Sequence, residues 1–197
     1  IICQEPWDFL SFHGSGFCTE EKMKNILILS ASPRKNGNSD ILCRRFIKGA
    51  QDAGHKTELI SLYDKNIECC RACYACFQTG KCVIGDDMEE ILNKMQQADV
   101  IVVATPTYFY TMNGKLKTVI DRFLPKWQEL GGHDVYLIIT GHDGKAGLRL
   151  AGEELKTIFG GLGNEIKGCI WGERVWQKGE VEGTKAMQEA YQAGYRA

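Results

Sequence analysis

Short apolar runs alternate with amphipathic segments from residue 25 onward, and this alternation constrains the fold more than any other feature. Residues 25–31 are almost continuously apolar, which is typical of a strand buried on both faces. Strands are predicted over 25–31, 56–62, 100–104, 135–140 and 165–171, and helices over 39–53, 86–97, 113–124, 146–159 and 184–194. Strands joined by helices predict an α/β fold, with a parallel sheet covered on both faces and ligands bound beyond the carboxyl ends of its strands.

Two of the predicted helices carry boundary signals. Asp86 and Glu89 have the spacing of a capping box, which predicts that a helix begins at Asp86. Pro125 is predicted to end the helix that begins at residue 113, because proline lacks the N–H group that a helix interior needs.

The composition suits one domain and argues against some partners. A length of 197 residues is ordinary for a single domain, and 44% hydrophobic residues are enough for a core. The formal net charge of −1 gives no electrostatic reason to bind nucleic acid or an anionic membrane surface. No apolar run approaches the ~20 residues that span a bilayer. We therefore expect neither nucleic acid nor a membrane as a partner.

Residues 1–22 differ from the rest of the chain. They mix aromatic side chains, glycine and charge without helical or strand periodicity, and they lack the basic and apolar regions of a secretory signal. We expect Met23 to be the natural start and residues 1–22 to be an extension foreign to the domain. The alternative is a genuine arm that packs on a partner subunit. The domain itself is expected over residues 23–197.

The chain has nine cysteines, which is a high count. With no export signal we expect a reducing, cytoplasmic compartment, in which disulfides are the poorer explanation. Cys43 and Cys169 are interpreted as small core residues, while Cys3 and Cys18 belong to the extension. The other five crowd into fourteen residues: Cys69, Cys70, Cys73, Cys76 and Cys82. Cys69 is interpreted as a packed neighbour of the other four.

Residues 30–39, with the sequence SASPRKNGNS, follow the first strand and lead directly into a helix. A helix N-terminus presents unpaired N–H groups and a partial positive charge, so it accepts a phosphate. Ser32, Asn38 and Ser39 can donate further hydrogen bonds, and Arg34 adds a formal charge. The alternative is a polar turn in which Asn38 or Ser39 caps the helix.

Residues 105–114, with the sequence TPTYFYTMNG, follow the third strand and place three aromatic residues where a flat ligand ring would lie. Pro106 fixes the backbone there, and Tyr108 or Tyr110 could stack on the ring. The alternative for such residues is a core or dimer contact. Residues 140–144, with the sequence TGHDG, follow the fourth strand and could offer backbone N–H groups to a ring edge.

Four stretches carry a family resemblance when they are taken together. They are SPRK at 32–35, Cys-x2-Cys-x2-Cys-x5-Cys at 70–82 followed by VIGDDM, ADVIVVATPTY at 98–108, and LKTVIDR at 116–122. With them the chain resembles the NAD(P)H-dependent FMN reductases and, within these, the iron–sulfur flavoproteins. The resemblance implies a flavodoxin-like fold with five parallel strands in the order 2-1-3-4-5. It also implies FMN as the cofactor, NAD(P)H as the electron donor and a homodimer or homotetramer.

The resemblance also implies where the cofactor lies. The first loop would hold the flavin phosphate through Ser32, Arg34, Asn38 and Ser39. The ribityl chain and ring would lie along Pro106, Thr107, Tyr108, Phe109 and Tyr110. Gly141 is added to this set because it follows the fourth strand, where the backbone could pass close to a ring edge. The segment over 116–122 is interpreted mainly as structure, with Lys117 and Asp121 as an i,i+4 ion pair. No catalytic residue is predicted, because the chemistry belongs to the flavin.

The cysteine-rich segment has four possible roles. Cys70, Cys73, Cys76 and Cys82 have a spacing compatible with a [4Fe–4S] cluster, and the spacing also matches the compact motif of the iron–sulfur flavoproteins. The same thiolates could bind zinc. Two of the thiols could form a redox-active pair. The loop could also hold nothing, as in many flavin reductases that the chain resembles.

Three functions follow from these features. The first is an FMN-dependent oxidoreductase that takes a hydride from NAD(P)H and passes electrons to a flavin, a quinone or another small acceptor. The alternative is an iron–sulfur flavoprotein that carries electrons between ferredoxin-type partners. The third is a flavin-binding module without enzymatic activity, which no feature of the sequence favours.

Overall fold

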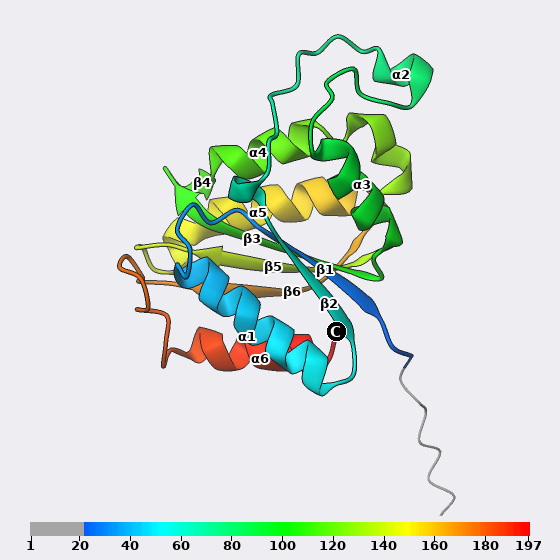
Figure 1. Cartoon of the computed structure of the whole chain (residues 1–197). Helices are drawn as coiled ribbons and strands as arrows, with labels where there is room; N and C mark the ends of the chain where they lie inside the picture. Colours follow the sequence, from blue (N-terminus) through cyan, green and yellow to red (C-terminus); the bar gives the residue numbers. More distant parts are fainter. Residues whose placement is uncertain (1–21) are drawn as a thin grey trace, which may run out of the picture.

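The computed structural model describes residues 22–197, so the expectations about the preceding segment lie outside the described residues. Figure 1 shows a sheet between two layers of helices. The strands are β1 (Asn25–Ser30), β2 (Lys56–Ser61), β3 (Val100–Tyr108), β4 (Thr111–Met112), β5 (Asp134–Thr140) and β6 (Glu165–Gly172). The helices are α1 (Asn38–Asp52), α2 (Cys76–Thr79), α3 (Met88–Gln97), α4 (Gly114–Asp121), α5 (Lys145–Gly161) and α6 (Lys185–Tyr195), with the 3-10 helices η1 (Leu62–Asp64) and η2 (Leu124–Glu129). None of the helices within residues 22–197 is both long and apolar enough to cross a membrane.

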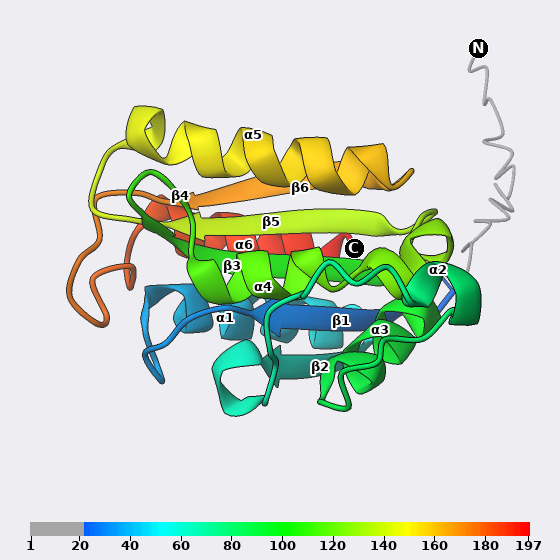
Figure 2. The ribbon, with the colours of Figure 1, turned by 90° about the horizontal axis from the view of Figure 1, so that it is seen from above.

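The five long strands are parallel, in the order β2-β1-β3-β5-β6. Helices α1 and α6 cover one face of the sheet, and α3, α4 and α5 cover the other (Figures 1 and 2). The predicted α/β fold and the predicted order of the long strands are therefore confirmed. The count of five is wrong, because the short strand β4 pairs antiparallel with the end of β3 and makes a sixth.

The core lies on both faces of the sheet. On one face Phe46 of α1 packs edge-on against Tyr136 of β5, with 5.2 Å between the ring centroids. On the other face Phe123 meets Phe159 of α5 at 6.1 Å. The central strands β1 and β3 are buried between these two layers, which explains why they are apolar almost without interruption.

The strand β3 runs further than predicted and ends at Tyr108. The chain then turns back through Phe109 and Tyr110, whose φ angles are 48° and 70°, and pairs Thr107 with Met112. Such a two-residue hairpin turn is usually made by Asn-Gly, so an aromatic pair gives no local signal for it. Thr107 and Tyr108 therefore lie on a strand rather than in a loop.

Two predicted helix boundaries are wrong. Helix α3 begins later than predicted, at Met88 with Asp87 as its N-cap. The Asp86 carboxylate pairs with the distant Arg122 and also accepts from the amide of Met88. Helix α4 ends at Asp121 without any help from proline. Pro125 lies in the first turn of η2, where its missing N–H group costs nothing.

Candidate functional site

A cleft of about 280 Å³ opens at the carboxyl ends of the parallel strands. Figure 2 shows the loops that follow these strands gathered at one end of the sheet. All ten residues that the sequence predicts for the cofactor line this cleft. The remaining lining residues are Pro33, Gly37, Thr140, His142, Asp143, Val175 and Trp176. We call it the strand-end cleft; its walls come from the segments after β1, β3, β5 and β6.

The turn from β1 into α1 leaves backbone amides without acceptors. Gly37 is the N-cap of α1, and no side chain caps the helix. The alternative in which Asn38 or Ser39 caps the helix is therefore wrong; the Ser39 hydroxyl oxygen instead lies 2.7 Å from that of Thr140. A Cβ atom at Gly37 would lie 2.9 Å from the carbonyl oxygen of Arg34, so only glycine fits this turn without a shift. The first-turn N–H groups carry the positive end of the helix dipole, which favours an anion.

Polar side chains fasten this turn to the segment that follows β6. Arg34 Nη1 donates a hydrogen bond to the carbonyl oxygen of Trp176 over 2.9 Å. Asn38 donates from Nδ2 to the carbonyl oxygen of Gln177 over 2.9 Å and accepts from the amide of Val181 over 3.3 Å. Both ends of the Asn38 side chain are therefore engaged within the protein.

The β3–β4 hairpin places aromatic rings at the mouth of the cleft. The side chain of Phe109 is 97% exposed, and Tyr110 and Tyr108 are also exposed. Non-glycine residues at positive φ cost about 1–3 kcal/mol each, and such strain concentrates at functional sites. The hairpin therefore keeps two strained, solvent-facing aromatic residues beside the cleft.

Trp176 also lines the cleft, and sequence reasoning missed it. Its ring meets His142 edge-on, with 5.6 Å between the ring centroids. A Cβ atom at Gly141 would collide with Thr107 Oγ1, so the backbone after β5 passes very close to β3. Sequence reasoning considered only the loops after the first, third and fourth strands. The same rule applied to the fifth strand would have included Trp176.

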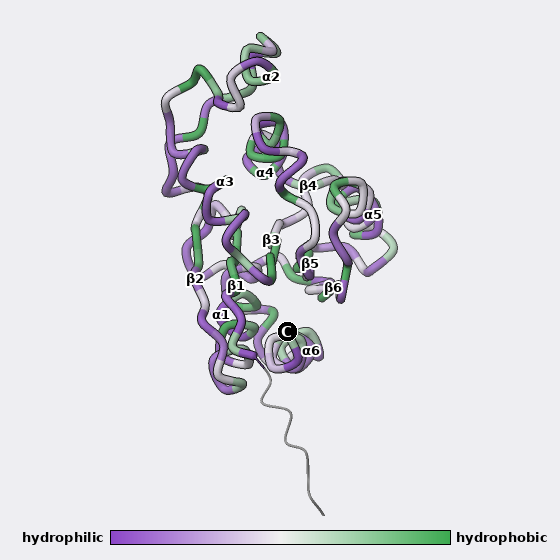
Figure 3. The backbone as a smooth tube through the Cα atoms, turned by 90° about the vertical axis from the view of Figure 1, so that its right-hand side faces the viewer, coloured by the Kyte–Doolittle hydropathy of each residue, from purple (hydrophilic) through white to green (hydrophobic). Residues whose placement is uncertain are grey.

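The four cysteines predicted as metal ligands line one small cavity of about 20 Å³. It lies between residues 121–125 and the cysteine loop, which we define as residues 69–85. Cys70 and Cys73 are exposed, and Cys76 and Cys82 are half-buried. In the part of the chain that the structure describes, no three His, Cys, Asp or Glu side chains are grouped closely enough to hold a metal ion. Figures 1 and 3 show α2, which belongs to this loop, standing away from the sheet.

Three further cysteines have different surroundings. Cys69 is exposed, with Sγ 3.9 Å from Thr118 Oγ1, so its interpretation as a packed neighbour is wrong. Cys43 is fully buried and Cys169 packs against the core, as predicted. Burial raises the pKa of both thiols, that of Cys169 to about 12. Because the thiolate is the reactive form, neither Cys43 nor Cys169 is suited to thiol chemistry.

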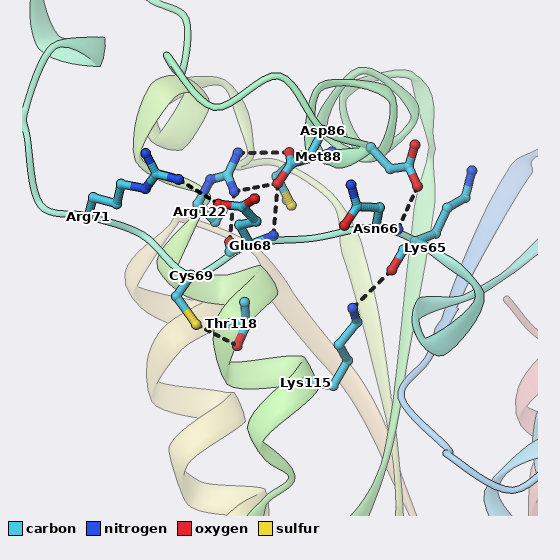
Figure 4. A network of polar contacts seen from close by, with 11 residues as sticks. Lys65, Asn66, Glu68, Cys69, Arg71, Asp86, Met88, Lys115, Thr118 and Arg122 are labelled. Atoms are coloured by element: carbon cyan, nitrogen blue, oxygen red, sulfur yellow. Dashed lines mark hydrogen bonds and ion pairs between the residues drawn. The ribbon is translucent and has the colours of Figure 1, made fainter.

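A buried ion pair closes the base of the cysteine loop (Figure 4). Arg122 is bidentate to Asp86, with Nη1 2.8 Å from Oδ2 and Nη2 2.9 Å from Oδ1. Arg122 Nη1 also donates to the carbonyl oxygen of Glu68 over 2.8 Å, and the Glu68 amide donates to Asp86 Oδ2 over 2.9 Å. The side chains of Arg122 and Asp86 are only 1% and 2% exposed. Glu68 precedes the loop and Asp86 follows it, so this pair joins the two ends.

The environment of Asp86 favours its charged form. Burial by itself raises the pKa of the carboxyl group, but hydrogen bonds from Arg122 and from the amides of Glu68 and Met88 outweigh it. The net result is a pKa below the ordinary value for aspartate. Asp86 is therefore an anion at neutral pH, matched to the Arg122 cation.

The fold and the site together define a class of protein. Parallel strands in the order β2-β1-β3-β5-β6, helices on both faces and a cleft at their carboxyl ends define a flavodoxin-like α/β protein. The profile of the NADPH-dependent FMN reductase family matches residues 24–167. The chain therefore belongs to this family of FMN-dependent oxidoreductases.

Individual relatives are similar over different lengths. An iron–sulfur flavoprotein of Methanocaldococcus jannaschii is 41% identical over 100 residues, which cover 51% of this chain and 52% of that protein. The chain spans about half the length of the first curated relatives it matches. A Bacillus subtilis protein named as an NAD(P)H-dependent FMN-containing oxidoreductase is 29% identical over 159 residues, covering 75% of this chain and 84% of that protein.

Solved structures share the fold. An NAD(P)H:quinone oxidoreductase from Methanothermobacter marburgensis superposes with a TM-score of 0.66 at 19% identity, covering 89% of this chain and 97% of that chain. At this level of identity the similarity concerns the fold alone.

Proposed function

We propose that the chain binds FMN in the strand-end cleft and transfers electrons from NAD(P)H to a small acceptor. The observation that carries this proposal is the convergence of the ten predicted residues, from three separate segments of the chain, on one cleft. Membership of the NADPH-dependent FMN reductase family supports it.

The phosphate of FMN would lie at the N-terminus of α1. The first-turn amides and the guanidinium group of Arg34 are the donors that suit it. Because the side chain of Asn38 already bonds to Gln177 and Val181, Asn38 would contribute its backbone amide. The Ser32 hydroxyl, which donates to the carbonyl oxygen of Arg34 over 3.0 Å, would hold the turn in shape.

The ring system would lie between the β3–β4 hairpin and the segment after β5. Pro106 and Tyr108 would flank it on one side, and the backbone at Gly141 would approach its edge. FMN, when bound, supplies a hydride acceptor for NAD(P)H and passes electrons on singly or in pairs. The exposed rings of Tyr110 and Trp176 border the mouth through which a nicotinamide would enter.

Steady-state kinetics test this function. FMN-loaded protein is assayed with NADH and with NADPH against free FMN, a quinone and ferricyanide. Turnover with at least one pair is expected, and the more efficient donor identifies the preferred nucleotide. No turnover with any pair, from protein shown to hold FMN, would overturn the reductase proposal.

A second candidate function is electron transfer through an iron–sulfur cluster in the cysteine loop. The specific observation in its favour is the single cavity lined by Cys70, Cys73, Cys76 and Cys82. Four thiols are the donor set that a [4Fe–4S] cluster needs, and several relatives are named iron–sulfur flavoproteins. Because the thiols do not form a cage as they stand, the loop would have to tighten around the cluster.

Anaerobic chemistry tests the cluster. The protein is purified without oxygen, reconstituted with iron and sulfide, and measured for iron, acid-labile sulfide and visible absorption. Equal iron and sulfide with a broad cluster absorption is the expected result. Zinc in place of iron, or neither metal, would contradict it.

Four expectations stay predictions. They are the electron acceptor, a ferredoxin-type partner, a homodimer or homotetramer, and a cytoplasmic location. Sedimentation velocity of the FMN-loaded protein measures the oligomer size directly.

A further inference from the structure

The guanidinium cation of Arg122 lies in a part of the molecule that solvent hardly reaches. Its side chain is 1% exposed, and it pairs there with Asp86, also buried. Burying a charge raises the free energy of the folded state unless the charge is paired. Apolar packing could hold the two ends of the loop together without that cost. The fork of Arg122 holds Glu68 and Asp86, one at each end of the cysteine loop.

One N–H donor of the Arg122 guanidinium group takes no part in these contacts. Arg122 Nε is buried and has no hydrogen-bond partner among residues 22–197. Buried polar groups are almost always paired, so this N–H group is available to an acceptor in the cysteine loop. Arg122 lines the same small cavity as Cys70, Cys73, Cys76 and Cys82. Cys82 and Arg122 also line the adjoining cavity formed with Asp86 and Met88.

We propose that Arg122 is a positioning residue for the cysteine site, with its Nε–H group donating a hydrogen bond to the sulfur of Cys82 when that sulfur is a cluster ligand. This inference rests on the proposed cluster. The two Nη groups would fix the ends of the loop while Nε fixes one ligand within it. A hydrogen bond donated to a ligand sulfur stabilises the more negative, reduced state of a cluster, so the Nε–H group would raise the reduction potential.

The test compares two changes at this pair with one exposed control. Arg122→Lys keeps the charge but removes the planar fork and Nε. The double variant R122Q/D86N removes both charges together, so that neither is left buried and unpaired. Arg149→Gln is the control, because Arg149 is an exposed arginine of α5 that lines neither of these two cavities. Each variant is reconstituted anaerobically, and FMN content checks that the sheet is folded.

Two readouts decide the outcome. Retention of iron against a chelator is expected to weaken roughly 10-fold or more in both Arg122 variants and not in Arg149→Gln. In an EPR-monitored titration, the midpoint potential of any remaining cluster is expected to fall in both Arg122 variants, because both lack the Nε–H donor. A merely structural anchor would not move the potential of a fully loaded cluster.

Two results would overturn the inference. Arg122 variants that hold FMN and iron with the wild-type potential would show that Arg122 does not act on the site. A wild-type protein that takes up no iron would instead remove the proposed cluster and, with it, this role for Arg122. The state of the wild type distinguishes the two failures.

Discussion

The strand-end cleft is assembled from segments that follow four different strands, whereas the cysteine loop is a single stretch of chain that leaves the domain after η1 and returns at α3. Three walls of the cleft follow the buried strands β1, β3 and β5, and the fourth follows the edge strand β6. The cysteine loop is held mainly at its base, through Arg122 and Asp86. One chain therefore combines a cleft whose walls come from separate strands with a loop that the rest of the domain holds mainly at its two ends. Changes in one region should therefore leave the other intact.

The largest expected effect is complete loss of one cofactor. The double variant C73A/C76A is expected to take up no cluster iron, because two of four ligands are gone, and to keep its full FMN content. Iron analysis and flavin absorbance on the same reconstituted sample measure both. Loss of FMN together with iron would show that the two regions are not independent.

Asp86→Ala should lower the free energy of unfolding by roughly 3–5 kcal/mol, because it leaves Arg122 buried and uncompensated. Urea denaturation of the FMN-loaded protein measures the change. A decrease below about 1 kcal/mol, the usual limit for an exposed pair, would mean that water reaches Arg122.

Arg34→Ala should weaken FMN binding by ~1.5–3 kcal/mol, the contribution of a charge-assisted hydrogen bond. Fluorescence titration of apoprotein with FMN measures it. Lys35→Ala is the matched control, because Lys35 is the next residue but does not line the cleft. Equal effects of the two changes would indicate that Arg34 acts on FMN only through the general positive charge of the loop, and not through a hydrogen bond to the phosphate.

Acid should weaken the ion pair at the base of the cysteine loop. The folded-state pKa of Asp86 is below its ordinary value, so Asp86 stabilises the fold fully above about pH 4. That contribution is lost as the pH falls through the lowered folded-state pKa. Urea denaturation between pH 3 and 5 should show a shallower pH dependence for Asp86→Asn than for wild type. Some slope should remain from Glu90, whose pKa is lowered to about 2 by hydrogen bonds from Lys65 and Lys94.

The smallest effect is expected on the exposed face of α4. Lys117 and Asp121 form the predicted i,i+4 pair, and both side chains are about half exposed. Lys117→Ala should cost only about 0.2–0.5 kcal/mol in unfolding and change neither cofactor. A larger loss would show that α4 positions the adjacent cysteine loop through this pair.

Sequence patterns were most informative where one physical rule applied to several segments at once. Because the carboxyl ends of parallel strands share one edge of the sheet, Ser32, Pro106 and Gly141 could be grouped without coordinates. Trp176 could not, because no motif marks the segment after β6. The hairpin at Phe109 and Tyr110 was also missed, since its residues are not those that favour such turns.

The sequence by itself determined the order of strands and helices, the family and the spacing of the four cysteines, because each depends on residues near one another in the chain. Only the tertiary structure decided which polar groups are already engaged. Asn38 bonds to residues about 140 positions away, and Asp86 pairs with the distant Arg122 as well as accepting from the amide of Met88. Such partners depend on the order and register of the strands, and local patterns do not encode that geometry.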